Sequence, residues 1–111
     1  MLNALPYLMT AIVCLQQPTV VVGCVQNALL NWVLIQIIRQ PRPHSSSYGM
    51  PSGHAQAAAY ATAVARPSMR WPLLALTAVI AAQRVVEGYH TPLQVVMGLS
   101  LGGLLGSVRL H

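Results

Sequence analysis

The sequence contains no lysine and only one acidic residue, Glu87, against six arginines. Charged residues make up 6% of its 111 positions, whereas a soluble domain carries about 25%. So few charges cannot cover a surface that faces water, and the sequence therefore indicates an integral membrane protein. Because the arginines are sparse and aromatic residues account for 5% of the chain, a nucleic-acid-binding domain is disfavoured.

Ligands for metal ions are equally scarce. A single carboxylate cannot form the oxygen cluster that holds Mg²⁺ or Ca²⁺. The two cysteines, Cys14 and Cys24, lie in apolar stretches without the spacing of a metal motif, and we expect them to be small buried side chains. The sequence therefore predicts a protein that uses no metal and no cofactor.

Apolar runs make up most of the sequence, which has 55% hydrophobic residues and no charged residue before Arg39. A helix needs roughly 20 apolar residues to cross the core of a bilayer. Prolines and glutamines interrupt the runs. We expect helices over residues 3–15, 19–39, 52–65, 70–88 and 91–108. The predicted fold is all-α, with residues 1–111 forming one domain, an integral membrane helical bundle of four to five transmembrane helices.

The segment PRPHSSSYGMPSGHAQ, residues 41–56, breaks the apolar pattern. Its prolines exclude a regular helix, and Ser52 is a suitable N-cap for the helix that follows. Following the spans along the chain brings the loop 41–54 and the turn 88–91 to the same side of the membrane. Polar side chains from both segments are therefore expected to meet at one end of the bundle.

This topology gathers a set of side chains suited to phosphate. Its members are Arg42, His54, Arg84 and His90. Arginine binds phosphate oxygens through paired hydrogen bonds, and the helix that opens at Ser52 and Gly53 can direct free N–H groups at an anion. One imidazole can attack phosphorus and the other can protonate the leaving oxygen. The sequence therefore predicts a phosphate site.

Taken singly, His54, His90 and Arg42 could simply face lipid headgroups, and Ser52 and Gln94 have purely structural explanations. Ser52 can serve as a plain N-cap. Thr91 and Pro92 suit the start of the last helix, and the spacing from Thr91 to Gln94 is that of a capping box. Neither explanation requires a ligand, so both stay open beside the functional one.

Small residues recur along one side of the last predicted helix, which allows helices to approach closely in lipid. They are Gly98, Gly102, Gly103 and Gly106. Among the aromatic residues, we expect Tyr48, Tyr89 and Trp71 to anchor at the membrane interface and Trp32 to pack inside the bundle.

Three motifs, in order, resemble the type 2 phosphatidic acid phosphatase family of membrane lipid phosphatases. They read RQPRP at 39–43, YGMPSGHAQ at 48–56 and QRVVEGYHTPLQ at 83–94. Over residues 31–96 the pattern looks most like the branch of dolichyl diphosphate phosphatases. Each motif alone is weak, but three in sequence within an all-helical membrane protein are specific.

The resemblance implies roles for individual residues. His90 would be the nucleophile that forms a phospho-histidine, and His54 would be the acid that protonates the leaving group. Arg42, Ser52, Gly53 and Arg84 would bind the phosphoryl oxygens. Gln94 stands where the family usually has an Asp that orients the nucleophile, and the dolichyl branch also has Gln there. The family mechanism needs no metal.

The chain departs from the family pattern at the first motif. This motif normally begins with a lysine seven residues before Arg42, where the chain has Ile35. Gln36 and Arg39 are expected to point to other sides of the helix, so neither replaces that cation. The third motif normally begins with a serine, where this chain has Gln83. The family has more spans than this sequence, so the resemblance also implies a domain shortened at its N-terminus.

Two functions from different classes follow. The first is a membrane phosphatase acting on dolichyl or another polyprenyl diphosphate. The alternative is a weakened or inactive homologue that serves as a structural subunit of a membrane complex, binding other subunits through the face of Gly98, Gly102 and Gly106. A phosphate-release assay would discriminate between them, because only the enzyme turns over.

The arginines also suggest an orientation and a location. Arg66, Arg70 and Arg109 lie at the opposite end of the predicted bundle from the site, and arginines outside a functional site prefer the cytosolic face. We therefore expect a lumenal site in the endoplasmic reticulum membrane, or the equivalent side of another organelle membrane. Arg39 lies on the site side and weakens this expectation.

Overall fold

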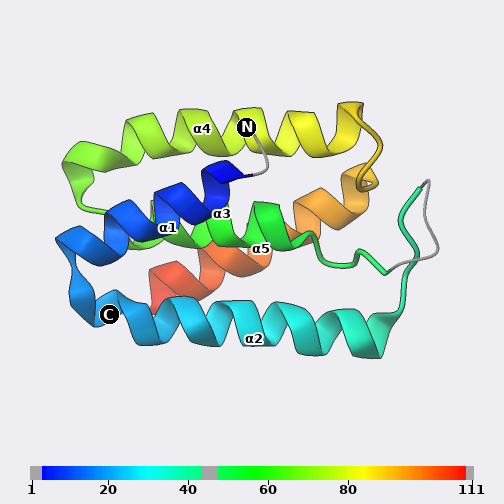
Figure 1. Ribbon diagram of the computed structural model, residues 1–111, viewed down its shortest axis with the longest axis horizontal. Coiled ribbons are helices and arrows are strands. Elements are labelled where there is room, and N and C mark those ends of the chain that lie inside the picture. The colour runs from blue at the N-terminus through cyan, green and yellow to red at the C-terminus, as the bar shows by residue number, and fades with distance from the viewer. Residues whose placement is uncertain (1–3, 44–47, 110–111) are drawn as a thin grey trace.

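The computed structural model describes residues 4–43 and 48–109, so positions 44–47 of the polar loop lie outside the described part. The regular elements of this part are helices, α1 (Leu5–Gln16), a 3₁₀ turn η2 (Pro18–Val20), α2 (Val21–Ile38), α3 (Gly53–Val64), α4 (Pro67–Val86) and α5 (Pro92–Arg109). Figure 1 shows α2 and α4 on opposite sides, with the other helices between them. The all-α prediction is confirmed.

The helix boundaries follow local signals in the sequence. Ser52 has an extended backbone and its Oγ accepts a hydrogen bond from Ala55 N at 3.3 Å, as expected of an N-cap. Helix α4 begins at Pro67 rather than near residue 70. The difference arises because Pro67 occupies the first turn, where its fixed φ favours a helix, and Arg66 before it is extended.

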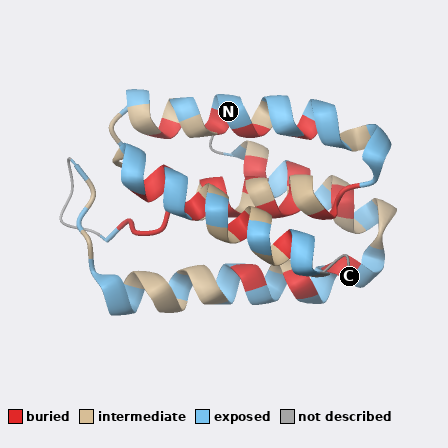
Figure 2. Cartoon of the chain, turned by 180° about the vertical axis from the view of Figure 1, so that it is seen from behind, coloured by how far each residue is buried: buried red, intermediate tan, exposed pale blue. Residues whose placement is uncertain are grey.

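Helix α3 lies at the centre and packs against α1, α2, α4 and α5. Half of its residues are buried, and half of these are alanines that let neighbouring helices come close. Figure 2 shows that buried residues gather on the central helices, whereas the outward faces of the outer helices are exposed. The core of the bundle is therefore built around α3.

The glycines of α5 face α3 of the same chain. A Cβ atom at Gly98 would lie 2.5 Å from Ser52 O, and one at Gly102 would overlap Gln56 O. Close packing through these glycines is thus confirmed, and Gly106 also contacts α3. The expectation that this face binds other subunits is wrong, because α3 already covers it.

An amide network joins α2 to α3. Gln56 Nε2 donates to Asn27 Oδ1 at 2.8 Å and to Asn27 O at 3.1 Å. Asn31 Nδ2 donates to Gln56 Oε1 at 2.9 Å and to Pro51 O at 3.0 Å. Because buried polar groups are costly unless paired, this network fixes how α2 sits on α3 in an otherwise apolar interface.

The far ends of α1 and α3 are tied together. Gln17 Nε2 donates to Val64 O at 2.9 Å, and Arg66 Nη2 donates to Gln16 O at 2.9 Å. Helix ends leave carbonyl groups without intrahelical partners, and these bonds satisfy two of them. At this end, the thiols of Cys14 and Cys24 lie 3.8 Å apart and pack against the core.

The outer helices expose apolar side chains. Val25, Leu29 and Trp32 on α2 are each about 60% exposed, so the prediction that Trp32 packs inside the bundle is wrong. Two segments, Pro18–Ile38 and Pro67–Val86, are long and apolar enough to cross a membrane. Apolar outward faces on such helices are typical of contact with lipid and support a membrane location.

Candidate functional site

The two predicted polar segments meet at one end of the bundle. Ser52 N donates to Gln94 O at 3.0 Å, and His90 Nδ1 lies 3.0 Å from Gly49 O. These contacts join the start of α3 to the turn between α4 and α5. The prediction that the two polar segments meet at one end of the bundle is therefore confirmed.

His90 is buried, with 2% of its surface exposed, and its two ring nitrogens have different surroundings. Nδ1 faces two carbonyl oxygens, Gly49 O at 3.0 Å and Gln94 Oε1 at 3.3 Å. Neither oxygen can donate, so the neutral ring carries its proton on Nδ1. Nε2 is buried without a hydrogen-bond partner among the described residues. The lone pair of Nε2 is thus left for a ligand.

The environment keeps this imidazole neutral. The pKa of His90 is lowered from 6.5 to about 4, mainly by burial and also by the nearby charges of Arg42 and Arg84. Hydrogen bonds to Gln94 and Gly49 act in the opposite direction. At neutral pH the ring is therefore uncharged and can act as a nucleophile.

Arg42 and His90 approach the backbone so closely at Gly49 that only a glycine fits, a role that the sequence analysis did not predict. A Cβ atom at this position would lie 2.7 Å from Arg42 Cγ and 2.9 Å from His90 Nδ1. Arg42 in turn donates from Nε to Tyr48 O at 3.3 Å. The absence of a side chain at Gly49 thus allows the loop to bring Arg42 beside His90.

Arg84 reaches the site from the last turn of α4, where only 3% of it is exposed. Its guanidinium carbon lies 4.2 Å from the centre of the Tyr89 ring. This distance is typical of a cation–π contact. Tyr89 therefore helps to hold the cation near His90, which neither the spacing nor the motifs had indicated.

A cavity of about 270 Å³ opens next to these groups, between α1, α2 and α3. Arg42, Gly53 and His54 line it, together with Ile35 of α2. The ring of Tyr7 in α1 meets the ring of His54 edge-on, with centroids 5.6 Å apart. Arg42 thus connects two groups of predicted site residues, the cavity around His54 and the buried surroundings of His90.

Known proteins resemble this chain over most of its length. The sequence profile of the PAP2 superfamily matches residues 9–111. The chain belongs to the PAP2 superfamily. It is 35% identical over 100 residues to lipid phosphate phosphatase epsilon 1, chloroplastic, of Arabidopsis thaliana. That alignment covers 76% of this chain and 36% of the plant protein, so the PAP2 chain spans little more than a third of its relative. No solved structure matches it significantly.

In the PAP2 chain, the structural explanations for Ser52 and Gln94 are confirmed. Ser52 Oγ caps α3 by accepting from Ala55 N. Gln94 and Thr91 form a capping box, since Thr91 N donates to Gln94 Oε1 at 3.0 Å and Gln94 N donates to Thr91 Oγ1 at 3.2 Å. The same Gln94 oxygen faces His90 Nδ1, so capping and orientation of the ring are compatible.

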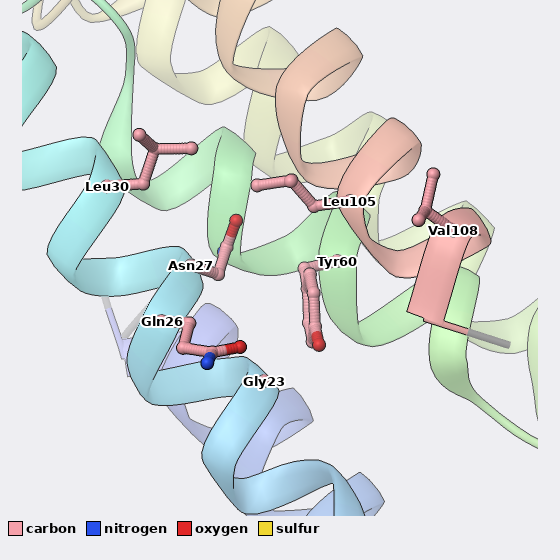
Figure 3. Close-up of a pocket in the computed structure, with 7 residues that line it drawn as sticks. All are labelled: Gly23, Gln26, Asn27, Leu30, Tyr60, Leu105 and Val108. Atoms are coloured by element: carbon pink, nitrogen blue, oxygen red, sulfur yellow. The ribbon is translucent and has the colours of Figure 1, made fainter.

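A second cavity, of about 320 Å³, lies between α2, α3 and α5 of the PAP2 chain (Figure 3). Gln26 and Asn27 of α2 and Tyr60 of α3 line it, and Asn27 also lines the cavity beside His54. Among the residues that the structure describes, no arginine or histidine lines it, so its described lining offers no positive charge of the kind expected at a phosphate site.

Proposed function

We propose that this PAP2 chain is a membrane lipid phosphatase that transfers a phosphoryl group to His90 and then to water. The observation that carries the proposal is the buried, neutral imidazole of His90, whose Nε2 has no hydrogen-bond partner in the described part of the chain and which has two arginines near it. A lone pair next to fixed positive charge suits attack on an anionic phosphorus centre, because the arginines can stabilise charge that develops on the oxygens.

The reaction has two steps. In the first, Nε2 of His90 forms a bond to phosphorus, the bond from phosphorus to the lipid oxygen breaks, and that oxygen leaves with the electron pair and takes a proton from His54. In the second, a water oxygen attacks phosphorus and gives a proton to His54. The bond to Nε2 breaks and its electron pair returns to the ring. Both histidines end as they began.

We further propose a polyprenyl diphosphate, such as dolichyl diphosphate, as substrate. The similarity of residues 31–96 to the dolichyl branch, including Gln94, supports this choice. The plant relative is named for lipid phosphates in general, so monophosphate lipids serve as comparison substrates. The bundle would cross the membrane with four to five helices, including the shorter apolar helices Leu5–Gln16 and Pro92–Val108.

The test is phosphate release by the purified full chain from a polyprenyl diphosphate and from phosphatidic acid. His90→Ala should abolish turnover and any acid-labile phospho-enzyme. His54→Ala should slow release most for poor leaving groups and least for an aryl phosphate, since it removes only the proton donor. Full activity of the His90→Ala protein would exclude the proposed nucleophile.

The position of Ile35 favours a second candidate function. Ile35 lines the cavity beside Arg42, where the family pattern has a lysine, so the cavity contains a methyl surface in place of a cation. A chain that binds phosphate weakly could serve as a structural subunit of a membrane complex. Purification would distinguish the two, because a subunit would co-purify with stoichiometric partners and release no phosphate.

For orientation, we propose a site on the lumenal side of the endoplasmic reticulum membrane or the equivalent side of another organelle. Support comes from Arg66 and Arg70, which are exposed at the end of the bundle away from His90. Ser68 lies between them and is exposed. Ser68→Cys, in a chain with its native cysteines replaced, should react with an impermeant reagent from the cytosolic side. Reaction only from the lumen would reverse the orientation.

A further inference from the structure

The fully buried amide of Gln94 has hydrogen-bond partners at both ends. Nε2 donates to Gln40 Oε1 at 2.8 Å and to Pro41 O at 2.9 Å. Oε1 accepts from Thr91 N at 3.0 Å and faces His90 Nδ1 at 3.3 Å. Turning the amide over would set carbonyl against carbonyl and N–H against N–H. Only one orientation is therefore satisfied, and in it an acceptor faces His90.

Gln40 also supports Gly49 O, the second oxygen that faces His90 Nδ1. Its backbone oxygen accepts from Gly49 N at 2.8 Å, and Gly49 O lies 3.0 Å from His90 Nδ1. The side chain of Gln40 thus contacts the Gln94 amide and its main chain contacts the Gly49 peptide. Gln40 does not line the cavity beside His54, so any influence on the reaction passes through these neighbours.

We propose that Gln40 is a positioning residue, whose side-chain oxygen holds the Gln94 amide with Oε1 toward Nδ1 of His90 and so keeps the lone pair of Nε2 directed at phosphorus. This inference rests on the proposed function. An Asp in place of Gln94 would offer two equivalent oxygens and would need no such support. A carboxamide has only one oxygen, so the groups around it must determine which end faces the histidine. The backbone groups Thr91 N and Pro41 O favour this orientation, and the side chain of Gln40 reinforces it.

The chemistry of the first step explains why this orientation matters. When Nε2 bonds to phosphorus, the ring becomes positively charged while Nδ1 keeps its proton. Acceptors at Nδ1 then form charge-assisted hydrogen bonds, which are stronger than those of the neutral ring. A Gln94 amide turned the other way would present a donor to that proton, so phospho-enzyme formation would slow without loss of the phosphate-binding groups.

Paired substitutions at position 40 test the proposal. Gln40→Leu removes the acceptor and keeps a similar volume, whereas Gln40→Glu keeps an oxygen at the same reach. We expect Gln40→Leu to slow phospho-enzyme formation from a lipid phosphate about 5- to 30-fold, with KM changed less than about twofold, as expected for one or two lost hydrogen bonds. Gln40→Glu should stay near the parent rate, and a rate as low as that of Gln40→Leu would overturn the proposal.

Nitrogen-15 NMR of histidine-labelled protein gives a readout that needs no turnover. With the His90 signals assigned through His90→Asn, the parent should show a proton on Nδ1 and none on Nε2. Gln40→Leu should shift both signals toward a tautomer mixture. If Gln40→Leu does not fold, Gln40→Asn takes its place, because the shorter side chain cannot reach the Gln94 amide. Unchanged His90 signals in the folded variant would refute the positioning role.

The two measurements separate this inference from the proposed function. If the parent forms no phospho-enzyme but the variant moves the His90 signals, the positioning role of Gln40 stands and the phosphatase activity is refuted. If the parent turns over and Gln40→Leu changes neither rate nor signals, the activity stands and the role of Gln40 is refuted.

Discussion

The ring of Tyr89 covers the guanidinium of Arg84, with the Cζ atom 4.2 Å from the ring centre. Cation–π contacts contribute about 0.5–2 kcal/mol, so the ring face should help to fix this cation at the site. Tyr89→Leu is expected to weaken binding of inorganic phosphate about 2- to 20-fold by this contribution. Tyr89→Phe, which keeps the ring face, should bind like the parent. Equal losses in both variants would point to the hydroxyl instead.

Neighbouring glycines of α5 should respond in opposite ways to alanine. A Cβ atom at Gly102 would overlap Gln56 O, whereas one at Gly103 would have no atom within 4 Å. Alanine normally stabilises a helix by roughly 0.5–1 kcal/mol relative to glycine, so Gly103→Ala should raise the unfolding temperature slightly. Gly102→Ala should lower it, with a cost of about 1–3 kcal/mol for overpacking.

Thermal unfolding in the same detergent compares the two variants directly. Because both substitutions lie in one helix and add one methyl group, the difference isolates the contact with α3. An unchanged unfolding temperature in Gly102→Ala would mean that α5 does not pack on Gln56 as closely as described.

Most of the fold could be predicted because its signals are local. The prolines and the cap at Ser52 set helix ends, and the order of spans brought the polar segments together. The burial of individual side chains could not be predicted as well. Apolar residues occur on all sides of helix α2, so its pattern does not distinguish an exposed Trp32 from a buried one. The glycines of α5 predicted close packing but could not identify α3 as the neighbour.

The sequence identified only part of the site. The charges and the order of the motifs identified His54, His90, Arg42 and Arg84. Gly49 contacts His90 across 41 positions of the sequence, and contacts at this separation leave no periodic pattern to recognise. Only the folded structure, in which the two loops meet, shows that Gly49 contacts His90.

Acid should destabilise the folded chain through His90. Its pKa is lowered from 6.5 to about 4 in the folded state, so between these values the unfolded chain binds the proton more readily. The contribution of the neutral His90 ring to the free energy of unfolding is complete above pH 6.5 and is lost as the pH falls toward 4. Between pH 7 and pH 5 the free energy of unfolding should fall by about 2 kcal/mol from this group.

The unfolding of the parent and of His90→Asn at both pH values measures this contribution. The remaining histidines are common to the two proteins, so they cancel in the comparison. The parent should lose more stability than the variant on acidification. An equal loss in both would mean that His90 is not buried in a neutral form.

The substitution Ile35→Lys tests what the missing cation does. Ile35 and Arg42 line the same cavity, so a lysine at position 35 would bring an ammonium group toward the phosphate site. A charge pair in partly desolvated surroundings interacts several times more strongly than in water. We expect Ile35→Lys to raise the affinity for inorganic phosphate about tenfold or more, or roughly 1.4 kcal/mol. Repulsion from Arg42 in the empty site limits the gain.

Gln36→Lys is the matched control for this experiment. Gln36 is the next residue of α2, is exposed, and does not line the cavity, so the same added charge there should leave phosphate affinity unchanged. A similar gain in both variants would indicate long-range attraction rather than a local contact. If the parent hydrolyses lipid phosphates rapidly, the structural-subunit function is excluded. If Ile35→Lys folds but gains neither affinity nor turnover, the cavity beside Arg42 is not where phosphate binds.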